Sequence, residues 1–345
     1  MNASNTNLSG VDVVKLFAAV MVLALHSNET YNEYVPSMFT HVFCQLAVPF
    51  FFLSSGYLFA MGLENTVPCT RMKTSVVKLV KLYAFWGFLI LGPFMVYDYF
   101  TMPKYEDADS LYIALILFRR FFVAGVGPYW YLLALLLCFL CIYPLRNKIR
   151  ILAVVAVLSI CLSICYDSYR RELATTVPME ALFTCFDFLY SCKNNFIMLG
   201  LPFTIAGYLI RKLKFHVSAR TAWLCVILFT VIITAEFMFQ NDFPRKSIAY
   251  IFQSVCLFFA ALSWNINIPK ERAKQVRALS SFIYFSHWMV LYYIVKPIVS
   301  SVFDLYPWTS ASIVPKFIFS LAICVVLYFT FSRCKHPFVK FVTNG

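Results

Sequence analysis

The sequence contains few charged residues and few glycines, and this scarcity excludes several classes of protein. Only 13% of its 345 residues are charged and only 10 are glycine, whereas soluble domains carry about 25% charged residues. Apolar residues make up 61% of the chain, and its mean hydropathy is +0.75. A soluble globule, a disordered chain and a collagen-like chain are therefore excluded, and the composition indicates a polytopic helical membrane protein.

Motifs for structural metal sites and for secretion are also missing. The 12 cysteines are scattered, and no pair of CxxC motifs is present, so we expect no metal site. Cys185 and Cys192 lie in a loop expected between Asp167 and Lys193. The sequence is compatible with a disulfide between them and equally with two free thiols. The N-terminus lacks the basic region and the cleavage site of a signal peptide, so its first apolar run is expected to remain as a helix.

Ten apolar runs approach the length of about 20 residues that a helix needs to cross a bilayer. They predict an all-α bundle of about ten transmembrane helices, forming a single integral membrane domain over residues 1–345. A shorter apolar stretch from Leu111 to Phe122 contains two arginines, and it predicts an interfacial or re-entrant piece. The expected spans cover residues 11–30, 39–60, 75–97, 129–145, 151–166, 194–210, 221–240, 247–265, 279–299 and 312–331.

The distribution of basic residues predicts how these spans are oriented. The loops after the even-numbered spans, together with the C-terminal tail, hold twice as many Lys and Arg residues as the other loops. Because basic loops stay in the cytoplasm, both termini are expected to be cytoplasmic, in the plasma (inner) membrane. This topology and attraction to anionic membrane lipids account for most of the net charge of +13, so we expect no nucleic-acid partner.

The first span carries a lysine and a histidine on one helix face. Lys15 and His26 are 11 residues apart, which corresponds to within about 20° of three full turns and a rise of about 16 Å. The pair predicts a polar track across the membrane, because ionisable groups inside a span are costly and usually functional. The alternative is that Lys15 reaches the membrane interface and His26 lies among the headgroups.

Small and basic residues mark the second and third spans. Ser54, Ser55 and Gly56 interrupt a run of large hydrophobes, where close helix packing is favoured over the lining of a cavity. Lys78 and Lys81 share a helix face near the start of the third span. They are predicted to act either as membrane anchors or as ligands for phosphate.

Aromatic residues surround the polar groups of the fourth and ninth spans. Trp130 lies between two tyrosines at the start of the fourth span, where an aromatic belt at the membrane interface is the default interpretation. In the ninth span Tyr284 and His287 are three residues apart and therefore share a face. A buried histidine among aromatics is a candidate for function.

These motifs, in this order, resemble those of the acyltransferase-3 family, integral membrane acyltransferases that modify cell-envelope polysaccharides and other acceptors. The first span reads VDVVKLFAAVMVLALH, with Asp12, Lys15 and His26 where the family has Asp, a basic residue and His. The second, third and ninth spans read VPFFFLSSGYL, KLVKLYAFW and SSFIYFSH at the corresponding motifs. Lysine stands where many members have arginine, and the resemblance covers nearly the whole chain.

The resemblance implies an O-acyltransferase that moves an acyl group, usually acetyl, from a cytoplasmic donor such as acetyl-CoA to a hydroxyl on the outer side. It implies no permanently bound cofactor. His26 and Lys15 are then the catalytic residues, with His26 as general base or acyl carrier and Lys15 attracting the phosphates of the donor. The expected donor-binding residues are Lys78, Lys81 and Arg71. The residues expected to line the passage or face the acceptor are Ser54, Ser55, Tyr57, Trp130, Tyr284 and His287.

The acceptor and two rival functions are left open by the sequence. The family implies a glycan or a lipid-linked saccharide as acceptor, but a lipid or an amino acid is also open, as is a protein partner that delivers it. A secondary transporter or flippase of a glycan or lipid intermediate would also place ionisable groups in a helix bundle, although the inverted repeats that it predicts are not visible. A membrane-bound sensor is the other rival, and in it His26 would be dispensable.

Overall fold

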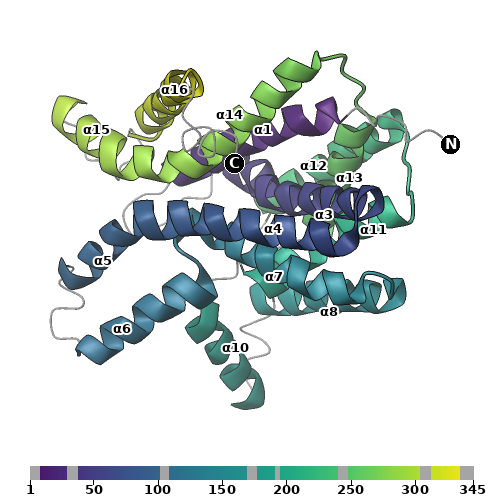
Figure 1. Cartoon of the computed structure of the whole chain (residues 1–345), viewed down its shortest axis with the longest axis horizontal. Coiled ribbons are helices and arrows are strands. Elements are labelled where there is room, and N and C mark those ends of the chain that lie inside the picture. Colours follow the sequence, from purple (N-terminus) through teal and green to yellow (C-terminus); the bar gives the residue numbers. More distant parts are fainter. Residues whose placement is uncertain are drawn as a thin grey trace. The chain divides into compact units, whose positions relative to one another are not determined.

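The structure, a computed structural model (Figure 1), is all-helical over the residues it describes, which are 8–28, 38–101, 109–168, 177–190, 195–239, 248–303 and 312–334. Eight helical segments among them are long and apolar enough to cross a membrane. This confirms a multi-pass helical membrane protein. The eight segments are Ser9–Ser27, Met38–Asn65, Pro68–Tyr97, Gly127–Leu145, Ile149–Tyr166, Ala219–Phe239, Lys270–Val299 and Ile313–Ser332.

Two of the ten expected spans are not among these eight segments. The eighth is α13 (Ile248–Ser263), which has 16 residues. The sixth consists of a π-helical segment (Phe196–Gly200) followed by α11 (Leu201–Lys212). It starts where the side chain of Asn195 accepts hydrogen bonds from two backbone amides of the first turn, as an N-cap does. The count of about ten spans and the orientation of the termini stay predictions.

The chain separates into two compact units. The first unit comprises Met1–Phe51, His216–Pro244 and Ile248–Gly345, and the second comprises Phe52–Phe215 with Arg245–Ser247. Helix α3 (Ala47–Asn65) contributes its first residues to the first unit and the remainder to the second. The single domain expected over residues 1–345 stays a prediction.

In the first unit, α1 lies alongside α14, and α12 packs against α13 (Figure 1). The start of α1 approaches α13 closely at Gly10, where an added Cβ would collide with the backbone carbonyls of Ala261 and Trp264. A small residue at this position lets the two helices touch. The elements of the unit include α1 (Ser9–Ser27), α2 (Met38–Val42), η1 (Cys44–Leu46), α12 (Ala219–Phe239), α13, α14 (Lys270–Met289), the π-helical η7 (Val290–Val295), α15 (Lys296–Phe303) and α16 (Ile313–Ser332).

In the second unit, α4 packs against α7 and α11 packs against α8. Helices α3 and α11 cross most closely at two glycines: a Cβ on Gly56 would collide with the Thr204 carbonyl, and one on Gly207 with the Leu53 carbonyl. The small-residue motif of the second span therefore serves helix packing. The other helices are α4 (Pro68–Tyr83), η2 (Ala84–Leu91), α5 (Gly92–Thr101), α6 (Ser110–Arg119), η4 (Arg120–Ala124), α7 (Trp130–Leu145), α8 (Ile149–Ser168) and α10 (Val177–Tyr190).

The prediction of a loop between Asp167 and Lys193 was wrong in part, because this stretch contains the helix α10 (Val177–Tyr190). An apolar cluster holds this helix: Phe183 is buried against Tyr166 of α8 and Met198. The Tyr166 hydroxyl also donates a hydrogen bond to Asp187. Contacts between segments distant in the sequence thus formed a helix where the local pattern suggested a connection. Cys185 on α10 is an exposed free thiol, and Cys192 lies outside the described residues.

The short apolar stretch before the fourth span is helical as α6 and η4. Arg119, at the end of α6, donates a hydrogen bond of 2.5 Å to the carbonyl of Phe188 on α10. Its guanidinium also lies 5.6 Å from the Phe188 ring centroid. The arginine that shortens this apolar run therefore joins α6 to α10.

Candidate functional site

Two histidines meet in the first unit, one on α1 and one on α14. The ring centroids of His26 and His287 lie 5.3 Å apart, and the ring planes are inclined by only 23°, so the two imidazoles stack. His287 is completely buried, and His26 is half-buried. Trp288 meets His26 edge to face, with centroids 4.9 Å apart. The structure thus brings together the two histidines that the sequence singled out in spans one and nine.

One ring nitrogen of His287 is held and the other is free to act. Nδ1 lies 2.6 Å from the carbonyl oxygen of Tyr284. Because a carbonyl can only accept a hydrogen bond, Nδ1 carries the proton, and the neutral ring has its lone pair on Nε2. This buried Nε2 has no hydrogen-bond partner within the described part of the chain. A buried polar atom without a partner costs free energy, which is typical of a group kept for chemistry.

Polar contacts set the register of α1 against α14. Arg277 Nη1 lies 3.6 Å from Asp12 Oδ2, and the Ser280 hydroxyl donates a 2.9 Å hydrogen bond to the carbonyl of Lys15. Together with the histidine pair, these contacts show that the two helices run parallel. Lys15 also lies close enough to Asp12 to attract its carboxylate. The role of Arg277 was not predicted from the sequence, although an acid inside the first span signals that a cation must lie nearby.

Tyr284 lies beside the histidine pair, as its spacing from His287 predicts. Its ring centroid is 5.9 Å from that of His287 and 5.4 Å from that of Phe51, at the start of α3. Both Tyr284 and Phe51 are buried. The histidines are therefore enclosed by aromatic rings, which lower the local polarity and strengthen electrostatic interactions there.

Two buried lysines in the first unit were not among the residues that the sequence singled out. Lys296, at the start of α15, is 5% exposed, and Lys316 on α16 is completely buried. The available signal was a cation inside a long apolar run, which is expensive in a membrane and therefore functional by default.

The second unit contains the serines predicted to line a passage. The Ser55 hydroxyl lies 2.9 Å from the hydroxyl of Tyr131 on α7. The Tyr131 ring packs on the Phe52 ring, with centroids 4.6 Å apart. The Trp130 ring also contacts Phe52, with a centroid distance of 5.9 Å. Ser54 is buried. Ser55 and the aromatic start of α7 thus share one interface between α3 and α7.

A group of cations lies along α4. The Arg71 guanidinium lies across Gly62, where a Cβ would collide with it, and it donates a 3.5 Å hydrogen bond to the Leu58 carbonyl. Lys78 lies near enough to Arg71 for the two charges to repel. Lys81, one turn further along α4, is exposed. Two of the three predicted donor-binding residues are therefore neighbours.

A second polar cluster at this end of the unit fixes the Tyr57 side chain. Arg211 on α11 forms an ion pair of 2.7 Å with Glu64, and its guanidinium lies 5.8 Å from the Tyr57 ring centroid. The tyrosine predicted to line the passage is thus packed under an arginine. Arg211 was expected in a loop. The structure places it in α11, where it contacts Glu64 and Tyr57 of α3.

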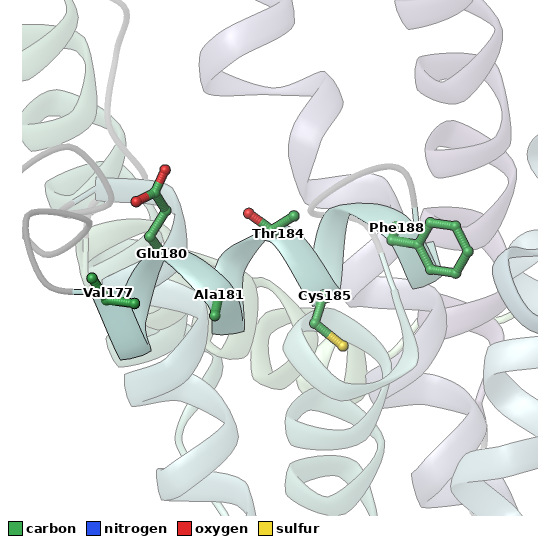
Figure 2. Close-up of a pocket in the computed structure, with 6 residues that line it drawn as sticks. All are labelled: Val177, Glu180, Ala181, Thr184, Cys185 and Phe188. Atoms are coloured by element: carbon green, nitrogen blue, oxygen red, sulfur yellow. The ribbon is translucent and has the colours of Figure 1, made fainter.

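The described residues line a hollow in each unit. One of about 240 Å³ lies in the first unit, mostly among apolar side chains of α1, α2 and α16, with Asn28 and Thr40 in its wall. The other, of about 580 Å³, runs along α10, where Glu180 and Thr184 project from one side of the helix and Cys185 from the other (Figure 2). Neither includes a residue of the predicted site. In the described ranges, no three His, Cys, Asp or Glu side chains gather to hold a metal ion.

Comparison with known proteins decides the family. The profile of the family described as an acyltransferase domain matches residues 8–329, nearly the whole chain. The chain belongs to the acyltransferase-3 family. This confirms the resemblance drawn from the first, second, third and ninth spans, and it supports acyl transfer as the general activity.

The curated relatives of this acyltransferase-3 chain are named as racemases rather than as acyltransferases. A serine/alanine racemase of Enterococcus gallinarum is 26% identical over 291 residues, which cover 81% of this chain and 40% of the relative. An amino-acid racemase of Enterococcus faecalis is 23% identical over 300 residues, covering 82% of this chain and 41% of the relative. This chain therefore spans about 40% of the length of these relatives. No solved structure matches it.

Proposed function

We propose that this acyltransferase-3 protein transfers an acyl group, in the simplest case acetyl, from acyl-CoA on the cytoplasmic side to a hydroxyl of an extracytoplasmic or lipid-linked glycan. The proposed location is the plasma membrane. The observation that carries the proposal is the stacked pair of His26 and His287 inside two membrane helices, because acyl transfer to a hydroxyl needs a base that works near neutral pH.

His26 is the proposed general base. It takes the proton of the acceptor hydroxyl while the oxygen attacks the thioester carbonyl; the carbon–sulfur bond then breaks, and the proton passes to the leaving thiolate. In the alternative, His26 first receives the acyl group itself and then yields it to the acceptor. His287 is the proposed positioning residue, since its ring stacks on His26 and is itself oriented by the Tyr284 carbonyl.

The proposed donor site uses Lys15, Arg71, Lys78 and Lys81. Coenzyme A carries several phosphates, and cations attract such groups. The closeness of Arg71 and Lys78 supports this assignment, because two neighbouring cations repel one another until an anion binds between them. Acetyl-CoA is then a donor substrate that is released after each turnover. The proposed passage residues are Ser54, Ser55, Tyr57, Trp130 and Tyr284.

The test is acyl transfer and thioester hydrolysis with labelled acetyl-CoA and the full chain purified in detergent. A catalytic base contributes roughly 10²–10⁴-fold, so His26→Ala should lower turnover by at least about 100-fold. The exposed His216 provides a matched control, and His216→Ala should retain full activity. Full activity in a folded His26→Ala variant would contradict the assignment. Absence of acyl-CoA binding and turnover in the wild type would favour the transporter instead.

A second class of acceptor is favoured by the names of the relatives. Racemases of serine and alanine act on amino acids, and serine carries a hydroxyl that could accept an acyl group. The discriminating measurement offers serine and alanine as acceptors in the same assay. Acylation of the serine hydroxyl, with alanine unchanged, would support this class, whereas transfer to a saccharide with neither amino acid acylated would support the glycan.

A further inference from the structure

Trp288 on α14 is a second residue whose ring contacts His26. Its plane stands at 84° to the His26 ring, with the centroids 4.9 Å apart. The His287 ring stacks on the same imidazole at 5.3 Å, inclined by 23°. Two consecutive residues of α14 therefore contact His26, one nearly parallel to its plane and one nearly perpendicular to it. A side chain packed against two rings in this way has little freedom to change its rotamer.

His26 lies at a position where such support is needed. Helix α1 ends at Ser27, so His26 is its penultimate residue, and the His26 side chain is only half-buried. The last turn of a helix lacks some of its backbone hydrogen bonds and frays more readily than the middle. A general base must nevertheless lie within hydrogen-bond reach of the proton that it takes. The orientation of His26 therefore has to come from another helix, and α14 supplies the contacts.

The Trp288 ring is held in turn by Tyr292. The two rings stack with centroids 4.1 Å apart and planes inclined by 24°. Lys296 Nζ also contacts the Tyr292 ring, 3.3 Å from its centroid. Tyr292 lies in the π-helical η7, and such segments change the hydrogen-bond spacing of a helix and are frequent at functional sites. The irregular backbone thus begins two residues after Trp288 and carries the residue that packs on it.

A tryptophan in a membrane helix usually has a different role. In the aromatic belt, the ring lies at the level of the lipid headgroups and serves as an anchor at the interface. Trp288 is instead half-buried, and its ring packs against the rings of His26 and Tyr292. These contacts are with the protein rather than with lipid, and one of them is with the proposed base. They favour a role inside the site over an anchoring role.

We propose that Trp288 is a positioning residue for acyl transfer, whose indole holds the His26 ring in the orientation that faces the acceptor hydroxyl, while Tyr292 holds the indole. This proposal rests on the proposed function of His26 as the base. Position matters because a displacement of about 1 Å can lower a rate about 100-fold. Trp288 itself exchanges no proton and no acyl group. Its removal therefore slows the chemical step and leaves the affinity for the donor unchanged.

The test measures acetyl-CoA hydrolysis by the purified full chain and its variants, with water as the acceptor. Trp288→Leu keeps an apolar side chain but loses the flat ring, so kcat should fall about tenfold while the KM for acetyl-CoA is unchanged. Trp288→Phe retains a ring against His26 and should keep most of the turnover. Tyr292→Leu removes only the support of the indole, so kcat should fall less, by about threefold.

A chemical probe separates the orientation of His26 from its intrinsic reactivity. Diethyl pyrocarbonate acylates a neutral imidazole nitrogen, with release of ethanol and carbon dioxide, and peptide mass spectrometry measures this reaction at His26. The small reagent approaches from any open direction, so it needs no fixed orientation of the ring. His26 in Trp288→Leu should therefore react at least as fast as in the wild type. A fall in this reaction in parallel with kcat would overturn the positioning role.

Trp223 on α12 provides a matched control, because it also forms a T-shaped ring contact, with Trp264 at a centroid distance of 6.2 Å, but touches neither histidine of the pair. Trp223→Leu should keep full turnover. Full turnover in Trp288→Leu, or a raised KM with an unchanged kcat, would overturn the proposal. If Trp288→Leu fails to fold, as a thermal melt would show, full turnover in Tyr292→Leu overturns the proposal by itself.

The positioning role and the proposed function fail in different ways in this experiment. Equal hydrolysis of acetyl-CoA by the wild type and by His26→Ala would overturn the proposed function, and the positioning role would fall with it. Loss of hydrolysis in His26→Ala together with full turnover in Trp288→Leu would overturn the positioning role alone. The expected result is a loss in both variants, larger in His26→Ala, with His26 still reactive toward diethyl pyrocarbonate in Trp288→Leu.

Discussion

The two units of this protein use ionisable residues in different ways. In the first unit, histidines and lysines are enclosed in apolar helices, where a completely buried imidazole stacks on a second one. In the second unit, cations lie at helix ends and are half-buried or exposed, beside helices that approach closely at glycines. The interactions of a buried ionisable group are little screened by solvent, so removing the group has a large effect. Exposed cations are screened by water and salt, so removing one of several has a small effect. Substitutions should therefore affect catalysis sharply in the first unit, and substrate affinity only gradually in the second.

The largest effect is expected where the second unit is packed most closely. Gly56→Val introduces a side chain where even a Cβ meets the Thr204 carbonyl, and overpacking of this kind costs about 3 kcal/mol. Resistance to denaturation by a titrated ionic detergent should fall accordingly. Gly87→Val is the control, since the space around Gly87 accepts a Cβ at ordinary contact distance. Equal stability of the two variants would show that the α3–α11 crossing is not a close packing site.

The second largest effect is expected for His287 in the first unit, where one substitution can separate the role of the ring nitrogens from that of ring packing. His287→Phe preserves an aromatic ring against His26 but removes both ring nitrogens. Turnover should fall about tenfold, equivalent to about 1.4 kcal/mol, while the KM for acetyl-CoA and the melting temperature change little. Restoration of full turnover by phenylalanine would mean that His287 contributes shape alone. The measurement is steady-state kinetics beside a thermal melt.

A smaller effect is expected from the hydroxyl pair of the second unit. Ser55→Ala leaves the buried Tyr131 hydroxyl without its 2.9 Å partner, which should cost about 1 kcal/mol of stability. Tyr131→Phe in the same chain should recover most of that loss, because both polar groups are then gone. The four chains of this double-mutant cycle are compared by thermal unfolding. Additive losses would show that the two hydroxyls do not interact.

The smallest effect is expected for the exposed donor-site cations. Lys78→Gln should raise the KM for acetyl-CoA about threefold with an unchanged kcat, because one screened charge contributes well under 1 kcal/mol. The effect should shrink at high salt. Lys73, exposed on the same helix, provides the comparison, and Lys73→Gln should leave the KM unchanged. An equal rise in both variants would indicate a general charge effect rather than a site.

Particular residues show how far the sequence could be interpreted. The spacing of Lys15 and His26, and that of Tyr284 and His287, was enough to place each pair on one face of its helix, because helical periodicity is local. The stacking of His26 on His287 was not predictable, since it joins residues more than 250 positions apart. The same holds for Arg277, which the sequence places in a loop and the structure places beside Asp12. The helix α10 was missed because its apolar partners lie in other segments.

Composition and periodicity by themselves determined that this chain is a multi-pass helical membrane protein, because a bilayer demands long apolar helices. The order of its motifs was enough to recognise the acyltransferase-3 family. Tertiary structure alone decided which residues meet: the stacked His26 and His287, the contacts of Tyr292 with Trp288 and Lys296, and the glycines where α3 and α11 cross. The physical reason is that hydropathy specifies which residues leave water, whereas side-chain packing specifies which neighbours they find there.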